Sequence, residues 1–254
     1  TAGENEDAVM RLLSGVGAMP LSQMGLSRSN LEQAQALVRQ PYGMVLVVGP
    51  TGSGKTSTLH SLLAEINDEK KKIWTVEDPV EITQQGLRQL QVNPEIDLTF
   101  ASAMRSFLRA DPDIIMVGEM RDPETAHMAI EASLTGHLVL STLHTNTAPE
   151  TITRLIGMGM EPFSFSDALM GILSQRLTRR LCGQSKKQYE AEPAEREEFV
   201  RHLGEEALPK ISTSGPLILF RGEGCPQCDR TGYQGRLSLH ELLVNSDEIR
   251  EAIQ

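Results

Sequence analysis

The stretch Gly49-Pro50-Thr51-Gly52-Ser53-Gly54-Lys55-Thr56 matches the phosphate-binding pattern G-x-x-x-x-G-K-[ST]. An apolar run at 44–48 precedes it and a helix-compatible run at 57–66 follows it, so the motif joins a strand to a helix. In such a loop, backbone N–H groups and the N-terminus of the following helix surround a phosphate, and Ser57 lies in the first turn of that helix. Lys55 reaches the terminal phosphates, and Thr56 ligates magnesium. The motif predicts a nucleoside triphosphate site; the alternative is a Gly/Ser-rich turn that matches by chance.

The composition favours a globular protein that handles nucleotides. Of the 254 residues, 39% are hydrophobic, and the formal net charge is −10. This charge disfavours general binding to nucleic-acid phosphates or an anionic membrane, which leaves a nucleic-acid translocase as a remote alternative. We find no apolar run that would span a bilayer and no signal-peptide pattern, so we expect nucleotide chemistry in the cytoplasm.

Apolar runs alternate with helical stretches after the phosphate loop. The runs 73–76, 114–117 and 138–140 are separated by expected helices at 99–110 and 122–136. This alternation predicts an α/β fold with a largely parallel sheet that is covered on both faces. Other expected segments are a strand at 8–13, a helix capped by Ser29 or Asn30 that ends before Pro41, a helix around 168–177, an acidic helix at 190–206 and a strand at 217–220.

Carboxylates follow two of the expected strands. Many phosphate-loop ATPases hold magnesium through an aspartate after a neighbouring strand, but here the run 114–117 is followed by Gly118 and then Glu119. Glu77 and Asp78 follow another strand and can supply the missing acid, because ligands gather at the carboxyl ends of parallel strands. Glu119 is then free to orient or deprotonate the attacking water. The alternative is that these acids only cap strands and solvate loops.

Four motifs, in this order, give the chain a resemblance to the secretion ATPase superfamily, and above all to the type II secretion and type IV pilus assembly ATPases. They are Gly49–Thr56, the acidic box Thr75-Val76-Glu77-Asp78-Pro79-Val80-Glu81, the run from Arg109-Ala110-Asp111-Pro112-Asp113 into Gly118-Glu119-Met120-Arg121-Asp122, and the stretch Gly136-His137-Leu138-Val139-Leu140-Ser141-Thr142-Leu143-His144-Thr145-Asn146.

The resemblance implies a RecA-like P-loop domain that works in a homo-hexameric ring. ATP hydrolysis there would drive an inner-membrane platform protein that adds pilin or pseudopilin subunits, with the motor cytoplasmic and peripheral to the membrane. We expect residues 1–20 to be the remnant of a preceding domain, 21–180 the ATPase domain, and 181–254 a cysteine-containing module with C-terminal helices. The alternatives are a nucleotide-binding regulatory or structural subunit with little turnover, or a pilus-retraction ATPase.

The resemblance also implies roles for individual residues. Glu119 is the catalytic glutamate, and Glu77 and Asp78 support magnesium and its water. His137 and His144 belong to a nucleotide-sensing histidine box, although a histidine after a helix-ending glycine could simply satisfy carbonyls at that helix terminus. Arg11 matches an arginine of the domain that precedes the motor in this family and closes over ATP.

Arg105 and Arg109 lie four residues apart on one expected helix, so both project from the same face. They could be a surface pair that makes salt bridges. Ring ATPases often complete a site with an arginine from a neighbouring subunit, because a guanidinium neutralises charge on the γ-phosphate. With the resemblance, both arginines become candidates for that interface.

Three cysteines, Cys182, Cys225 and Cys228, resemble a tetracysteine zinc module in which one cysteine is missing. Ser185 stands where the fourth thiolate is expected. Zinc takes four tetrahedral ligands, and a serine hydroxyl is a poor replacement for a thiolate. His202 or His240 could complete the site; a module without zinc is the alternative, and we expect substoichiometric or absent zinc.

Overall fold

The computed structural model describes residues 17–205 and 215–254. The expected strand at 8–13 and Arg11 lie outside these ranges. The chain divides into two compact units: the first comprises residues up to Leu177 together with Ser238–Gln254, and the second comprises Thr178–Leu237. The boundary at 181–254 expected from the sequence differs from this division at the C-terminal segment.

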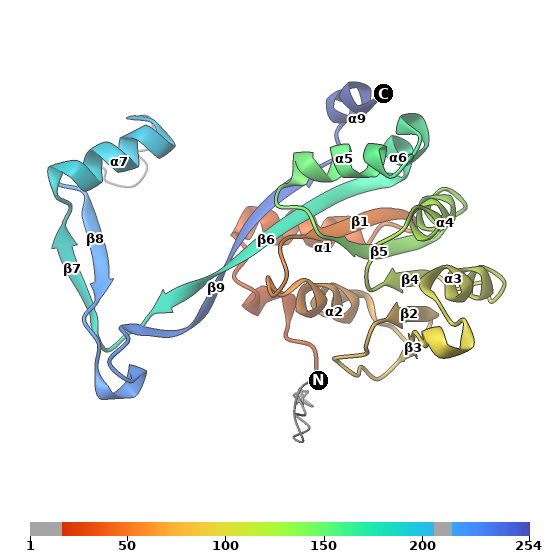
Figure 1. Ribbon diagram of the computed structural model, residues 1–254, viewed down its shortest axis with the longest axis horizontal. Coiled ribbons are helices and arrows are strands. Elements are labelled where there is room, and N and C mark those ends of the chain that lie inside the picture. Colours follow the sequence, from red (N-terminus) through yellow and green to blue (C-terminus); the bar gives the residue numbers. More distant parts are fainter. Residues whose placement is uncertain (1–16, 206–214) are drawn as a thin grey trace, which may run out of the picture. The chain divides into compact units, whose positions relative to one another are not determined.

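The first unit is an α/β unit whose helices and strands alternate along the chain (Figure 1). Its sheet has the order β3-β2-β4-β5-β1-β6-β9, and the pairings from β3 to β6 are parallel. The fold class predicted from the sequence is therefore confirmed. The strands are β1 (Gly43–Val48), β2 (Ile73–Glu77), β3 (Leu87–Gln91), β4 (Ile114–Val117), β5 (Leu138–Leu143), β6 (Leu169–Leu181) and β9 (Tyr233–Val244).

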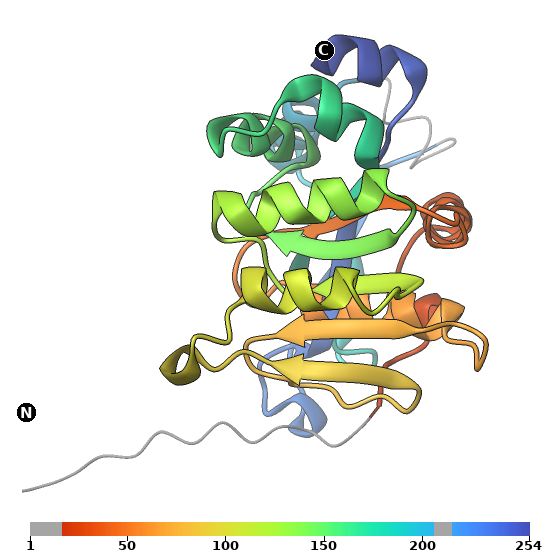
Figure 2. The same ribbon diagram turned by 90° about the vertical axis from the view of Figure 1, so that its right-hand side faces the viewer.

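Helices cover both faces of this sheet. Successive side chains of β1 point to opposite faces, so they pack against different helices. Met44 and Leu46 pack in a core with residues of α3, α4, α5 and α6, whereas Val45 and Val47 pack with residues of α1 and α2. Figure 2 looks onto the face that α3 and α4 cover. The helices are η1 (Leu21–Gln23), α1 (Arg28–Val38), α2 (Lys55–Ile66), η2 (Pro94–Ile96), α3 (Phe100–Leu108), α4 (Pro123–Leu134), α5 (Ala148–Gly157), α6 (Pro162–Ala168) and α9 (Asp247–Ile253).

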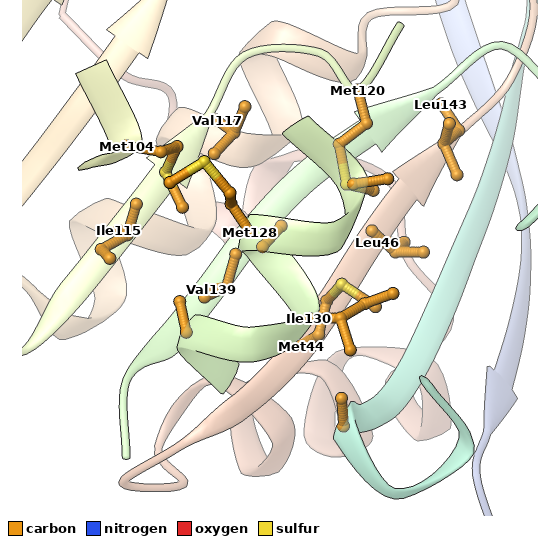
Figure 3. Packing of buried hydrophobic residues seen from close by; sticks show 14 of the residues in the cluster. Met44, Leu46, Met104, Ile115, Val117, Met120, Met128, Ile130, Val139 and Leu143 are labelled. Carbon is orange, nitrogen blue, oxygen red and sulfur yellow. The ribbon is translucent and has the colours of Figure 1, made fainter. Parts of the chain in front are cut away.

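The face under α3 and α4 is packed largely with methionine and branched aliphatic side chains. In Figure 3, Met104 of α3 and Met128 of α4 belong to one buried cluster with Ile115 of β4 and Val139 of β5. All four side chains are at most 9% exposed. This packing fixes β4, and with it the loop that begins at Gly118.

Two local predictions are wrong. The segment around 168–177, expected to be helical, is mostly strand β6, which pairs with β1. A short run that is buried on both faces has no clear period, so it cannot be told from a buried helix by its pattern. The cap of α1 is Ser27, whose Oγ accepts from the Asn30 N–H at 3.2 Å, and not Ser29 or Asn30.

The second unit is small and has few buried side chains. Antiparallel strands β7 (Lys186–Glu190) and β8 (Ile218–Gly222) form a two-stranded sheet, accompanied by α7 (Pro193–Leu203) and η4 (Pro226–Cys228). Among the described residues of this unit, those that are buried are Cys182, Ser185, Leu217, Cys228 and Gly232. Three of them belong to the cysteine module predicted from the sequence, which therefore forms most of this small core.

Candidate nucleotide-binding and catalytic site

The phosphate loop lies between β1 and α2, as the motif predicts. Gly54 is the N-cap of α2 with φ of 89°, a left-handed conformation that glycine adopts without strain. Lys55 is 9% exposed, and its Nζ donates to the main-chain carbonyls of Gly49 at 2.9 Å and Pro50 at 3.2 Å. Burial lowers the pKa of Lys55, and the charge of Glu119 opposes that shift. The lysine is thus held against the loop and within electrostatic reach of Glu119.

Glu119 follows β4 at the carboxyl edge of the sheet, the same edge as the phosphate loop. Its Oε1 is 2.7 Å from Nε2 of His144, which follows β5, and its Oε2 accepts from Arg121 Nε at 2.8 Å. Arg121 also reaches Asp78, with 3.5 Å between Nη1 and Oδ2. The structure therefore brings three predicted residues, Glu119, His144 and Asp78, into one cluster around Arg121.

Glu77 is 2% exposed and belongs to a separate buried network. Its Oε1 accepts from Thr75 Oγ1 at 2.7 Å and from Gln89 Nε2 at 3.1 Å, and its Oε2 pairs with His60 Nε2 at 3.1 Å. Burial opposes ionisation, but the hydrogen bonds from His60, Thr75 and Gln89 hold the pKa of Glu77 below its usual value. The role of Glu77 in supporting magnesium stays a prediction.

His60 of α2 is the other half of that buried pair. Its Nδ1 lies 2.7 Å from Gln84 Oε1, and the Gln84 amide is oriented by its own Nε2, which donates to the His60 carbonyl at 3.1 Å. Both ring nitrogens therefore face acceptors, an arrangement that favours the doubly protonated ring. Burial lowers the pKa of His60, but the hydrogen bonds to Glu77 and Gln84 outweigh it and raise the pKa above its usual value.

Gly118 occupies the position where many phosphate-loop ATPases carry an aspartate. A Cβ there would lie 3.2 Å from the carbonyl oxygen of Val76 and 3.3 Å from Cα of Glu77. Both distances are tighter than ordinary van der Waals contact, because the ends of β2 and β4 approach closely at this point. The sequence predicts that other acids replace the aspartate missing at position 118, and this close approach gives a steric reason for its absence.

The remaining predicted residues lie apart from this cluster. Arg105 forms an exposed ion pair with Glu124 of α4, and Arg109 is the exposed C-cap of α3. His137 precedes β5 at the opposite edge of the sheet, where its Nδ1 lies 3.0 Å from the Ala132 carbonyl at the end of α4. The length of β5 places it on the order of 20 Å from His144. The structure does not join these three residues to Glu119, and their roles stay predictions.

The three cysteines of the second unit do come together. Their sulfur atoms lie within 4.8 Å of one another, at 3.8 Å for Cys182 to Cys225 and 3.7 Å for Cys225 to Cys228. Zinc bound tetrahedrally at about 2.3 Å from each sulfur would separate sulfurs by about 3.8 Å. Ser185 Oγ lies 3.8 Å from Cys228 Sγ. Three thiols therefore fit zinc, with a serine hydroxyl next to them.

No histidine joins this group among the described residues. His202 is exposed on α7, and His240 belongs to the first unit, where burial lowers its pKa. Burial raises the pKa of Cys228, but N–H groups of Cys225 and Gly232 and the Ser185 hydroxyl outweigh it, so that the pKa falls to about 6. A thiolate at this position is ready to ligate a cation.

Sequence reasoning missed three residues around the loop and the acids: His60, Arg121 and Gln175. Arg121 lies two positions after Glu119, which is a usable signal, because a cation that close to a carboxylate can pair with it. His60 lies on the buried face of an amphipathic helix, and Gln175 lies in a segment for which the sequence predicts a helix. Neither position carries a local signal, because each partner is distant in the sequence.

Comparisons with known proteins agree on one family. A family model described as "Type II/IV secretion system protein" matches residues 1–254. The type II secretion system ATPase E of Vibrio cholerae is 47% identical over 253 residues, which are 99% of this chain and 48% of that protein. The type IV pilus assembly ATPase PilB of Thermus thermophilus is 51% identical over 249 residues, which are 98% of this chain and 27% of that protein. The chain thus spans half or less of these relatives.

Solved structures agree on the fold. The crystal structure of the pilus retraction motor PilT with bound ADP matches with a TM-score of 0.68 at 31% identity, over 96% of this chain and 57% of that chain. The ATPase DotB of Legionella pneumophila matches with a TM-score of 0.63 at 26% identity, over 93% of this chain and 53% of that chain. Among the residues that our structure describes, no helix is both long and apolar enough to cross a bilayer.

Proposed function

Because the chain belongs to the type II/IV secretion system protein family, we propose that it is the ATP-hydrolysing motor part of a protein that assembles a type II secretion pseudopilus or a type IV pilus. One observation carries the hydrolytic part of the proposal: Glu119 and the phosphate loop lie at the same edge of a parallel sheet, with Glu119 in electrostatic reach of Lys55. A module that only binds nucleotide has no need of an acid there.

The loop residues fit a triphosphate. The Ser53 hydroxyl is buried and has no hydrogen-bond partner among the described residues, and Lys55 Nζ has only main-chain carbonyls as partners. Thr56 and Asp78 are the residues we propose to hold magnesium. When bound, the ion would supply positive charge that neutralises the phosphates. Glu119 would then orient the attacking water and accept its proton.

Three further parts of the proposal come from the resemblance to the secretion ATPase superfamily. The motor would act as a homo-hexamer in which Arg105 and Arg109 reach a neighbour's nucleotide. It would drive an inner-membrane platform protein from the cytoplasmic side. The three cysteines supply three of the four ligands of a zinc site, so any zinc held there would be bound weakly unless a fourth strong ligand completes the shell.

Retraction of a pilus is the second candidate function. The likeness to the retraction motor PilT favours it, since that protein matches over nearly the whole chain. The cysteine module favours assembly instead, and by resemblance that module belongs to assembly enzymes. Both candidates share the same hydrolytic site.

The variant Glu119→Gln tests the hydrolytic site. We expect it to keep ATP binding and to lose nearly all hydrolysis, because an amide cannot accept the proton while Lys55 and Thr56 still hold the phosphates. Glu131→Gln, an exposed acid on α4, is the matched control and should hydrolyse ATP like the wild type. Turnover of Glu119→Gln within a fewfold of the wild type, in an active preparation, would remove Glu119 from the catalytic role.

A further inference from the structure

Gln175 is a buried polar residue of β6 whose side chain reaches the phosphate loop. It is 1% exposed. Its Nε2 donates to the carbonyl oxygen of Ser53 at 2.5 Å, and its Oε1 accepts from Thr58 Oγ1 at 2.6 Å. One amide group therefore joins the loop to the first turns of α2, and both of its ends are satisfied.

The main chain at Gln175 also shapes the loop. A Cβ on Gly49 would lie 2.3 Å from the Gln175 carbonyl oxygen, so the first residue of the motif must lack a side chain here. A Cβ on Gly54 would lie 3.1 Å from Gln175 Nε2. Both ends of the loop thus pack directly on residue 175.

The bond from Gln175 to Ser53 fixes the orientation of one loop peptide. In a trans peptide the C=O and N–H groups point in opposite directions, so a Ser53 carbonyl held toward Gln175 turns the Gly54 N–H away from it. N–H groups of such loops are the donors that cradle phosphate. If this peptide flipped, a carbonyl oxygen would replace a donor and would repel phosphate.

We propose that Gln175 is a positioning residue for the phosphate loop: its amide holds the Ser53–Gly54 peptide in the phosphate-binding orientation, with Thr58 holding the amide in turn. It acts on the affinity for the polyphosphate group and leaves the nucleoside part of the ligand untouched. This inference rests on the proposed nucleotide binding and extends it to a residue outside the motif.

The test compares Gln175→Met with Gln35→Met. Methionine has a similar length but cannot donate or accept as the amide does. Gln35 is a matched control, because its Nε2 also bonds to an α2 residue, Glu65, at 3.0 Å, far along the helix from the loop. ADP with magnesium is titrated calorimetrically, adenosine is measured by competition, and thermal melting without ligand checks the fold.

We expect Gln175→Met to bind ADP at least about tenfold more weakly, as follows from losing about 1.4 kcal/mol of hydrogen bonding. Adenosine affinity should stay within twofold, and Gln35→Met should bind both ligands like the wild type. An equal loss for adenosine and ADP, or no loss for ADP, would overturn the proposal. Failure of the wild type to bind ADP would instead refute the proposed function.

Thr58→Val is the second variant, and its affinities for ADP and adenosine are measured if Gln175→Met does not fold. It keeps the shape of the threonine side chain but removes the hydroxyl that holds Gln175 Oε1. We expect a weaker selective loss of ADP affinity, of about threefold, as expected for one neutral hydrogen bond. Unchanged ADP affinity in a folded Thr58→Val protein would overturn the proposal.

Discussion

The buried pair of His60 and Glu77 makes a prediction about stability and its dependence on pH. Both side chains are almost fully buried, at 0% and 3% exposure. Replacing His60 by glutamine leaves the Glu77 carboxylate with Thr75 and Gln89 but without a cationic partner. We therefore expect His60→Gln to lower the free energy of unfolding at pH 6.

The magnitude follows from the kind of contact that is lost. A hydrogen bond to a charged group contributes about 1.5–3 kcal/mol, and removing one member of a buried ion pair costs about 3–5 kcal/mol. Glutamine keeps one donor near Glu77, so we take about 2–3 kcal/mol. For a protein of this size each kcal/mol changes Tm by about 2–4 °C, which gives a fall of about 4–12 °C.

The effect should depend on pH with a definite sign. The pKa of His60 is raised in the folded state, so its stabilisation is complete below its unfolded value of about 6.5 and is lost as the pH rises through the folded value. The pKa of Glu77 is lowered, so its stabilisation is present above about pH 4.3 and is lost as the pH falls through the folded value. The pair therefore stabilises the fold most between about pH 4.3 and 6.5.

Thermal melts of the wild type and His60→Gln from pH 5 to 8.5 measure this directly. The difference in Tm should be largest near pH 6 and should shrink toward pH 8.5. His127→Gln, an exposed histidine on α4, is the control and should change Tm by about 1 °C or less. A His60→Gln protein that melts like this control at pH 6, or a difference that widens toward pH 8.5, would refute the ion pair.

Two further predictions concern the ring and the cysteine cluster. Arg105→Ala and Arg109→Ala should reduce hydrolysis more than nucleotide affinity. Mixing either variant with Glu119→Gln subunits should recover some activity, because an interface between the two kinds of subunit restores one complete site. Mixed hexamers that are confirmed to form but show no recovery would exclude a role of these arginines in a neighbour's site. Elemental analysis of the purified protein should find substoichiometric or no zinc. Ser185→Cys should restore zinc binding and raise Tm, because a fourth thiolate completes the coordination shell. One chelator-resistant zinc per wild-type chain would contradict this prediction.

The features predicted well from the sequence are those fixed by local pattern. The loop from Gly49 to Thr56 carries its own turn chemistry, and Asp122 accepts from the Thr125 N–H at 2.8 Å as an N-cap should. The alternation of strands and helices was enough to predict the parallel sheet, which in turn predicted that Glu77, Asp78 and Glu119 follow the carboxyl ends of its strands.

The features that were missed depend on tertiary pairing. The sequence of β6 predicts a helix, because a strand buried on both faces lacks the alternation that identifies strands. Gln175 and Thr58 are 117 residues apart, so no local pattern links them. His60 has the same difficulty, because its partner Glu77 lies on a different element and their hydrogen bonds, which outweigh burial, shift the pKa of each.

The close approach at Gly118 makes the acids of this site interdependent in evolution. An aspartate at 118 would need the β2 backbone around Glu77 to shift by a few tenths of an ångström, and that backbone also sets the buried pair with His60. Substitutions at 118 and 77 should therefore have non-additive effects on stability. A sequence with an aspartate at 118 and the sequence of this chain, with Gly118 and Glu77, are separated by single-substitution variants. Such a variant would have either a strained end of β2 or no carboxylate at one of the two positions.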